Sequence, residues 1–222
     1  MVNTTPSKNS LENYFLPFTA NKDFKKEPRL LDRGEGVYYW NHKGDKVIDA
    51  SSGLFCVPLG HGRKEIADAV HQQLLKLDYS PSFQVSHLPA FACAEKIANM
   101  LPGDLNNVFF TVCGSTAIDS AIKIVQAYQH AVGQSHRMKF VSRERAYHGV
   151  NIGGTSLSGM IKNREIFTAS MPGVIHLRHT WLSENKFKKG QPEEGAHLAD
   201  DLQRFVDTVS YTHLTLPTIY SV

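Results

Sequence analysis

Short apolar runs alternate with amphipathic helical patterns through the second half of the sequence, and this alternation restricts the possible folds more than any other feature. Residues 107–112, 138–141 and 173–177 are apolar runs that contain β-branched or aromatic residues, which is typical of buried strands. The apolar spacing of residues 115–132 and 194–206 predicts helices. Strands that alternate with helices predict an α/β fold, with a mainly parallel sheet and helices on both of its faces.

The first half of the sequence predicts smaller elements. Strand-like runs flank a turn-rich segment within residues 34–49, which indicates a β-hairpin. Residues 49–62 contain four glycines or prolines, so we expect irregular chain there. Apolar residues recur at helical spacing over residues 63–77 and 89–101, and Pro102-Gly103 ends the second of these predicted helices.

Composition narrows the class of protein. The 222 residues carry a formal net charge of only +3 and the basic residues are scattered, which argues against a nucleic-acid partner. Cys56, Cys93 and Cys113 have no metal-ligand spacing, which favours reduced thiols in a cytoplasmic protein. His176 and His179 lack a third ligand and are interpreted as surface residues, so no metal site is expected. The sequence has neither a signal-peptide pattern nor a membrane-span pattern.

The strand–turn–helix transition at residues 109–117 is the first candidate site. The N–H groups that open a helix have no partners within it and lie at the positive end of its dipole, so they favour an anion. Gly114 allows close approach of a ligand, and Ser115 adds a hydroxyl group. Alternatively, Ser115 is an ordinary helix cap, and the spacing alone favours that interpretation.

The second candidate site follows the predicted strand at residues 138–141. Ligands of open α/β sheets bind at the carboxyl ends of the strands, where Tyr147 offers a flat ring and a hydroxyl group. The alternatives are that Tyr147 is a packed loop aromatic and that His148 is an ordinary loop histidine. Four glycines come next, at Gly149, Gly153, Gly154 and Gly159. They suit either close approach of two chain segments or flexibility.

Five segments, in their order and spacing, together resemble the class-III aminotransferases of the omega-amino-acid:pyruvate (β-alanine:pyruvate) type. The segments are residues 49–56 (DASSGLFC), 59–62 (LGHG), 78–84 (DYSPSFQ), 113–123 (CGSTAIDSAIK) and 147–149 (YHG). The resemblance extends from residue 34 to residue 207 and implies the type-I fold of transferases that depend on pyridoxal 5'-phosphate (PLP), here in truncated form. It implies that residues 1–57 contribute to a small domain and that residues 58–207 form the first part of the large, PLP-binding domain.

The same resemblance implies roles for individual residues. Gly114 and Ser115 are expected to hold the PLP phosphate and Tyr147 to lie against the PLP ring, with Cys113 and His148 also at the cofactor. Side chains expected to line the substrate pocket are Leu54, Phe55, Phe83 and Tyr147. Many relatives carry Ser, Glu and Trp where this sequence has Cys113, Thr116 and Phe55. Loss of the carboxylate at position 116 removes one contact near the cofactor, and Phe55 leaves a roomier pocket.

The resemblance implies a transaminase that moves an amino group from an omega-amino acid or amine to pyruvate or another keto acid, as a homodimer. In the family the lysine that forms the Schiff base lies downstream, and no lysine here falls in the matching motif. We therefore expect no catalytic residue in this chain, which alone is expected to be inactive and poorly folded, with an exposed sheet edge. The alternatives are another type-I PLP enzyme (aminomutase, racemase or decarboxylase) and a non-catalytic scaffold protein.

The last segment, residues 208–222, contains no Asp, Glu, Lys or Arg, unlike the rest of the sequence. It has neither helical nor clean strand periodicity. We expect a foreign or disordered tail there, and the alternative is a genuine exposed tail.

Overall fold

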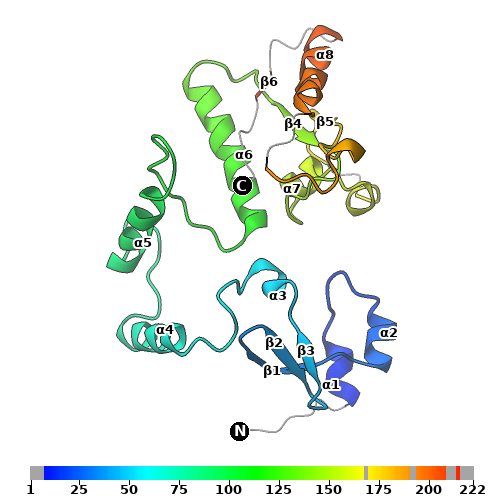
Figure 1. Ribbon diagram of the computed structural model, residues 1–222. Coiled ribbons are helices and arrows are strands. Elements are labelled where there is room, and N and C mark those ends of the chain that lie inside the picture. Colours follow the sequence, from blue (N-terminus) through cyan, green and yellow to red (C-terminus); the bar gives the residue numbers. More distant parts are fainter. Residues whose placement is uncertain (1–7, 168–169, 191–193, 209–213, 216–222) are drawn as a thin grey trace. The chain divides into compact units, whose positions relative to one another are not determined.

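The computed structural model of the protein describes residues 8–167, 170–190, 194–208 and 214–215. The chain divides into two compact units, Met1–Glu95 and Lys96–Val222, which run from blue to green and from green to red in Figure 1. Within the described ranges, no helix combines the length and the apolar character that crossing a lipid bilayer requires.

The first unit contains a small antiparallel sheet. Its elements up to the sheet are α1 (Lys8–Asn13), α2 (Asn21–Lys26), β1 (Leu31–Glu35), β2 (Tyr38–Asn41) and β3 (Lys46–Ile48), and the strand order is β1-β2-β3. The predicted hairpin is confirmed, because β2 and β3 pair as neighbours. Its turn closes where the Asn41 side-chain oxygen accepts the backbone N–H groups of Lys43 and Asp45, both at 2.9 Å.

The next two long helices, the second of which includes the boundary between the units, also follow the sequence pattern. The predicted helices at residues 63–77 and 89–101 are confirmed as α4 (Lys64–Lys76) and α5 (Leu88–Ala98). Between the sheet and α4 lies α3 (Ser52–Phe55), a single turn with left-handed backbone angles rather than an ordinary helix. It falls within residues 49–62, where irregular chain is predicted.

The second unit contains a parallel sheet. Its elements are α6 (Gly114–Ala131), β4 (Lys139–Arg143), α7 (Ile152–Leu157), η1 (Ile161–Asn163), β5 (Val174–Leu177), η2 (Ser183–Asn185), η3 (Ala196–Ala199), α8 (Asp200–Thr208) and β6 (Leu214–Thr215). The strand order is β5-β4-β6, and both pairs are parallel. Three of the predictions are confirmed here: the long helix α6 and the strands β4 and β5 (Figure 1).

The core of the second unit lies where α6 and α7 cover one face of this sheet. Phe140 of β4 is fully buried and packs with Ile122 of α6 and Leu157 of α7. Partly buried apolar side chains surround this cluster, namely Ile118, Val125, Met171 and Val174. Phe140 and Val174 are register partners, so their side chains lie on the same face of the sheet. This packing fixes α6 and α7 against the sheet, and both helices bear on the candidate site described below.

Two sequence-based predictions in the second unit are wrong. Residues 107–112 form no strand within the described chain, and Phe109, Phe110 and Val112 are exposed. An apolar run becomes a strand only where a neighbour pairs its backbone, and none of the described residues does so here. The helix predicted over residues 194–206 exists as α8, but its predicted start is wrong, because α8 begins at Asp200 after the 3-10 turn η3. Gly195, which comes before η3, adopts a φ of 131° that a helix does not allow.

The tail interpretation falls largely outside the described residues. Thr208 ends α8, and residues 214–215 form the two-residue strand β6 beside β4. A strand at this place differs from the expectation of a wholly irregular segment. Whether residues 208–222 are foreign to the protein stays a prediction.

We predict that Phe140→Ala lowers the free energy of unfolding by roughly 3–5 kcal/mol, because it leaves a cavity at the centre of the apolar cluster. Phe187→Ala, which truncates an exposed side chain, is the matched control and changes the unfolding free energy by less than about 0.5 kcal/mol. Urea titrations of the three proteins measure both effects. Equal midpoints for the two variants would contradict this core assignment.

Candidate cofactor-binding site

The first turn of α6 presents backbone N–H groups that no helical carbonyl accepts. The first hydrogen bond of the helix runs from the Ala117 N–H to the Cys113 carbonyl at 3.0 Å, so the amides of residues 114–116 precede the helical ladder. A Cβ atom at Gly114 would meet nothing within 4 Å, which leaves the approach to these amides open. An eighteen-residue helix also contributes a substantial dipole at this end. The turn is therefore suited to bind an anion.

We call residues 144–159 the glycine loop; this glycine-rich segment follows β4 and includes α7. Two hydrogen bonds hold it against this end of α6. The Val150 N–H donates to the Ser115 hydroxyl oxygen at 3.0 Å, and the Gly154 N–H donates to Asp119 Oδ1 at 3.2 Å. Ser115 and Asp119 lie one helical turn apart and so share a face of α6. The structure thus brings together residues 113–115 and 147–149, the two segments that the sequence analysis singled out separately.

The glycines of this loop are needed for close packing. A Cβ atom at Gly149 would lie 2.7 Å from the Cα of Ser115, and one at Gly153 would lie 2.7 Å from Ile122 Cδ1. Added Cβ atoms at Gly154 and Gly159 would collide with backbone carbonyls of the loop and of β4. Of the two readings open from sequence, close approach of two segments is the correct one.

Tyr147 lies in this loop with its side chain 57% exposed. Among the described residues it has no hydrogen-bond or ring partner, so its ring is available for stacking. The packed-aromatic alternative does not fit this exposure. Its assignment to the cofactor ring remains a prediction.

His148 ties the same loop to the sheet. A hydrogen bond of 3.0 Å joins its Nε2 atom to the hydroxyl group of the buried Ser142 on β4. Burial, followed by the charge of the nearby His176, lowers the pKa of His148, so the ring is neutral at pH 7. These contacts make His148 an anchor of the loop, and a direct contact with the cofactor remains a prediction.

The pKa of the Cys113 thiol reflects the electrostatic character of the turn. Its exposed Sγ atom lies 3.4 Å from the Thr116 hydroxyl oxygen. Hydrogen bonding by the Thr116 side chain, and next by the Thr116 backbone N–H, lowers the pKa of the Cys113 thiol. The same groups that favour a thiolate favour a phosphate. The residues present therefore fit an anionic cofactor group.

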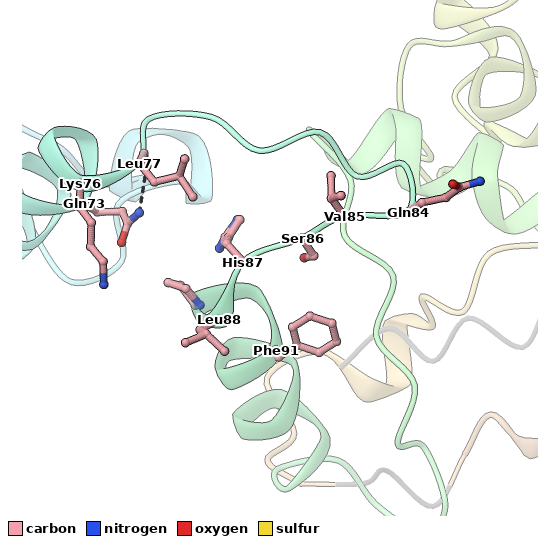
Figure 2. A pocket seen from close by; sticks show the side chains of 10 residues that line it. Gln73, Lys76, Leu77, Gln84, Val85, Ser86, His87, Leu88 and Phe91 are labelled. Atoms are coloured by element: carbon pink, nitrogen blue, oxygen red, sulfur yellow. Dashed lines mark hydrogen bonds between the residues drawn. The ribbon is translucent and has the colours of Figure 1, made fainter.

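The expected substrate-pocket residues Leu54, Phe55 and Phe83 belong to the first unit, whereas Tyr147 belongs to the second. All three are highly exposed, so none serves as core of its unit. Just after Phe83, residues 84–91 and the end of α4 enclose a mostly apolar pocket of about 630 Å³. Figure 2 shows its lining side chains, among them Leu77, Leu88 and Phe91, but Phe83 is not part of that lining.

The interpretation of His176 and His179 as surface residues is wrong, because both are half-buried. His176 Nε2 lies 3.2 Å from the Leu157 carbonyl oxygen, which binds the ring within the fold. Over the described ranges, no group of three or more His, Cys, Asp or Glu side chains is arranged to hold a metal ion.

Sequence reasoning gave no role to Asp119 or Ser142, which hold the glycine loop at its two ends. For Asp119 a signal existed, since it lies four residues after Ser115 on the same helix face. No such signal existed for Ser142, because its hydrogen bond to His148 depends on how the loop folds back over β4.

The fold and this site define a class of protein, which comparison with known proteins identifies. The sequence model of the family described as "Aminotransferase class-III" matches residues 19–210, and the chain belongs to that family. Class-III aminotransferases depend on PLP. The omega-amino acid–pyruvate aminotransferase of Pseudomonas putida is 46% identical over 202 residues, which cover 90% of this chain and 45% of the relative.

Two further proteins agree with this family assignment. The omega-aminotransferase of Caulobacter vibrioides is 45% identical over 199 residues, which cover 89% of this chain and 45% of the relative. The structure of an omega transaminase of Pseudomonas jessenii in complex with PMP aligns with a TM-score of 0.85 and 29% identity, over 96% of this chain and 48% of that one. The chain therefore spans about half the length of the relatives it matches, and its fold is that of PLP-dependent omega-transaminases.

We predict that Gly149→Ala lowers the free energy of unfolding by roughly 1–3 kcal/mol, since the added methyl group collides with Ser115 and Gly149 adopts a φ of 100°. Gly114→Ala is the matched control, because a Cβ atom there meets open space. Thermal melts of the two variants and the unchanged chain provide the measurement. If Gly149→Ala melts at the same temperature as Gly114→Ala, the loop does not dock on α6 as described.

Proposed function

We propose that residues 113–116 and 147–149 hold PLP in a transaminase that moves an amino group from an omega-amino acid to pyruvate. The docking of the glycine loop on the first turn of α6 carries this proposal. That docking gathers amides that lie outside the helical ladder, a hydroxyl group and an exposed aromatic ring in one place. The substrates are those named for the relative from Pseudomonas putida.

Each of these residues makes a different contact with the cofactor in this proposal. The amides of residues 114–116 donate hydrogen bonds to the phosphate oxygens, and the dipole of α6 favours the negative charge there. The Ser115 hydroxyl oxygen accepts the Val150 N–H, a bond that does not use the hydroxyl proton, and this proton donates to a phosphate oxygen. Tyr147 covers the flat ring of the cofactor and keeps water from that face. Gly114, at which a Cβ atom would meet nothing within 4 Å, leaves space for the phosphate to approach.

PLP, when bound, supplies the electron-withdrawing ring that makes transfer of an amino group possible. We assign binding and orientation to the residues of this chain, and none of its lysines to the Schiff base. Residues 1–57 belong to a small domain in this proposal, and residues 58–207 to the PLP-binding domain. Leu54, Phe55 and Phe83 face the amine substrate, and the whole protein acts as a cytoplasmic homodimer.

The proposal predicts that PLP protects Cys113 from alkylation by iodoacetamide, because Cys113 begins the turn that receives the phosphate. Cys56 and Cys93 are also exposed and free, so they serve as internal controls that PLP leaves unprotected. Peptide mass spectrometry at increasing PLP concentration gives the three rates separately. Equal protection of all three thiols, or no protection of Cys113, would contradict the proposed phosphate site.

We further predict that Tyr147→Ala weakens PLP binding by roughly 3- to 10-fold, because the stacking contact is lost, while the affinity for inorganic phosphate is unchanged. Tyr128→Ala removes an equally exposed tyrosine from the other end of α6 and is expected to change neither affinity. Calorimetric titration with each ligand separates the ring contact from the phosphate contact. A parallel loss of both affinities in Tyr147→Ala would contradict the assignment of Tyr147 to the ring.

A further inference from the structure

Four consecutive residues in the first unit adopt left-handed backbone angles. The values of φ are 50° at Ser52, 60° at Gly53, 58° at Leu54 and 67° at Phe55. Only glycine accepts this region without cost, and each other residue there is unfavourable by about 1–2 kcal/mol. A run of this kind persists only where its surroundings fix it, and such runs concentrate at functional sites.

The carboxylate of Asp49 fixes the beginning of this left-handed turn. Its side chain is only 4% exposed and accepts a hydrogen bond from the Gly53 N–H at 2.7 Å. It also accepts the Ser51 N–H at 3.2 Å and the Ser51 hydroxyl group at 3.3 Å. A buried carboxylate with several donors at its two oxygens holds these donors strongly, because each bond is charge-assisted.

His61 connects this carboxylate to the antiparallel sheet. Its Nε2 atom donates to Asp49 Oδ2 at 2.7 Å, and its ring lies against Tyr39 of β2 with centroids 4.3 Å apart. The backbone of His61 pairs with that of Gly36 in both directions, at 2.9 and 3.0 Å. A Cβ atom at Gly34 would lie 2.9 Å from the His61 ring, so β1 leaves the room that the ring occupies.

The electrostatics of this group favour an ionised Asp49. The hydrogen bond from His61 lowers the pKa of the Asp49 carboxyl group. Burial, and next the charge of Asp49, raises the pKa of Tyr39. Asp49 is therefore ionised and Tyr39 neutral at pH 7, the states in which the bonds described above form.

The side chains that this turn exposes to solvent are apolar. Leu54 is 73% exposed and Phe55 is 83% exposed, although both are large hydrophobic side chains. An unfavourable backbone that is held in place only to expose two apolar side chains gains nothing for the packing of the unit. Leu54 and Phe55 are therefore available for a contact outside the unit.

We propose that Asp49 and His61 are positioning residues for the amine substrate, because they hold the left-handed turn that presents Leu54 and Phe55 to it. This inference rests on the proposed function, in which both side chains face the substrate. It adds two residues that touch neither cofactor nor substrate and act only through the turn. It also gives a role to the buried pair of Asp49, which precedes this segment, and His61, which follows it.

Hydrogen exchange of the protein that carries this chain provides the first test, because it needs neither cofactor nor turnover. Asp49→Asn is expected to speed exchange at the amide of Gly53 by about ten-fold or more, since a charge-assisted acceptor is lost. Asp45→Asn, which changes an exposed carboxylate in the hairpin turn, is the matched control and leaves that amide unchanged. Unchanged exchange at Gly53 in Asp49→Asn would overturn the proposal.

Steady-state kinetics of the protein that carries this chain, with β-alanine and pyruvate, provide the second test. Asp49→Asn and His61→Gln are expected to raise the KM for β-alanine roughly 3- to 10-fold while PLP affinity stays constant. Ser52→Gly added to Asp49→Asn relieves the left-handed strain at one position and is expected to restore part of the KM. An unchanged KM, despite faster exchange at Gly53, would also overturn the positioning role.

The two proposals fail in different ways. If the unchanged protein binds no PLP, the proposed function fails, and the positioning role falls with it. If PLP binds and the Cys113 footprint appears, but the Asp49 and His61 variants keep the original KM, only the positioning role is overturned. A global loss of structure in Asp49→Asn would speed exchange throughout the first unit, and then His61→Gln and the Ser52→Gly rescue decide the result.

Discussion

The candidate site depends on two hydrogen bonds between the glycine loop and one face of α6, accepted by Ser115 and Asp119. Without them the free amides of the helix and the ring of Tyr147 belong to separate segments of the chain. The bonds form only because the loop approaches α6 at a distance that Gly149 and Gly153 allow. A binding site is thus defined as much by missing side chains as by those that contact a ligand.

Much of the fold was predictable because its signals are local. The spacing of apolar residues located α4, α5 and α6, and a turn-rich segment located the hairpin of β2 and β3. The two segments of the site were also visible, as a helix start and as a loop after a strand. That these two segments lie together could not be predicted, because it depends on how residues far apart in the sequence pack together.

Other features escaped prediction because they are set by tertiary contacts. The run at residues 107–112 has the composition of a strand, yet it lacks a pairing partner in the described chain. The left-handed turn at α3 contradicts the local preference of Leu54 and Phe55. The buried bonds of Asp49 stabilise it, together with backbone hydrogen bonds to the Ser51 and Ser52 carbonyl oxygens. His176 was interpreted as a surface residue because its hydrogen bond to the Leu157 carbonyl oxygen depends on the fold, whereas the hydrogen bond of His148 to Ser142 agrees with the loop-histidine alternative.

The parallel arrangement around β4 has a consequence for how the polypeptide acquires its structure during synthesis. Adjacent strands of the antiparallel sheet leave the ribosome in succession and can pair at once. By contrast, β4 must wait for β5 until a whole crossover segment has been translated, and longer still for β6. During that interval the aromatic side chain of Phe140 lacks part of its cover, so the nascent second unit passes through a stage prone to association with other chains.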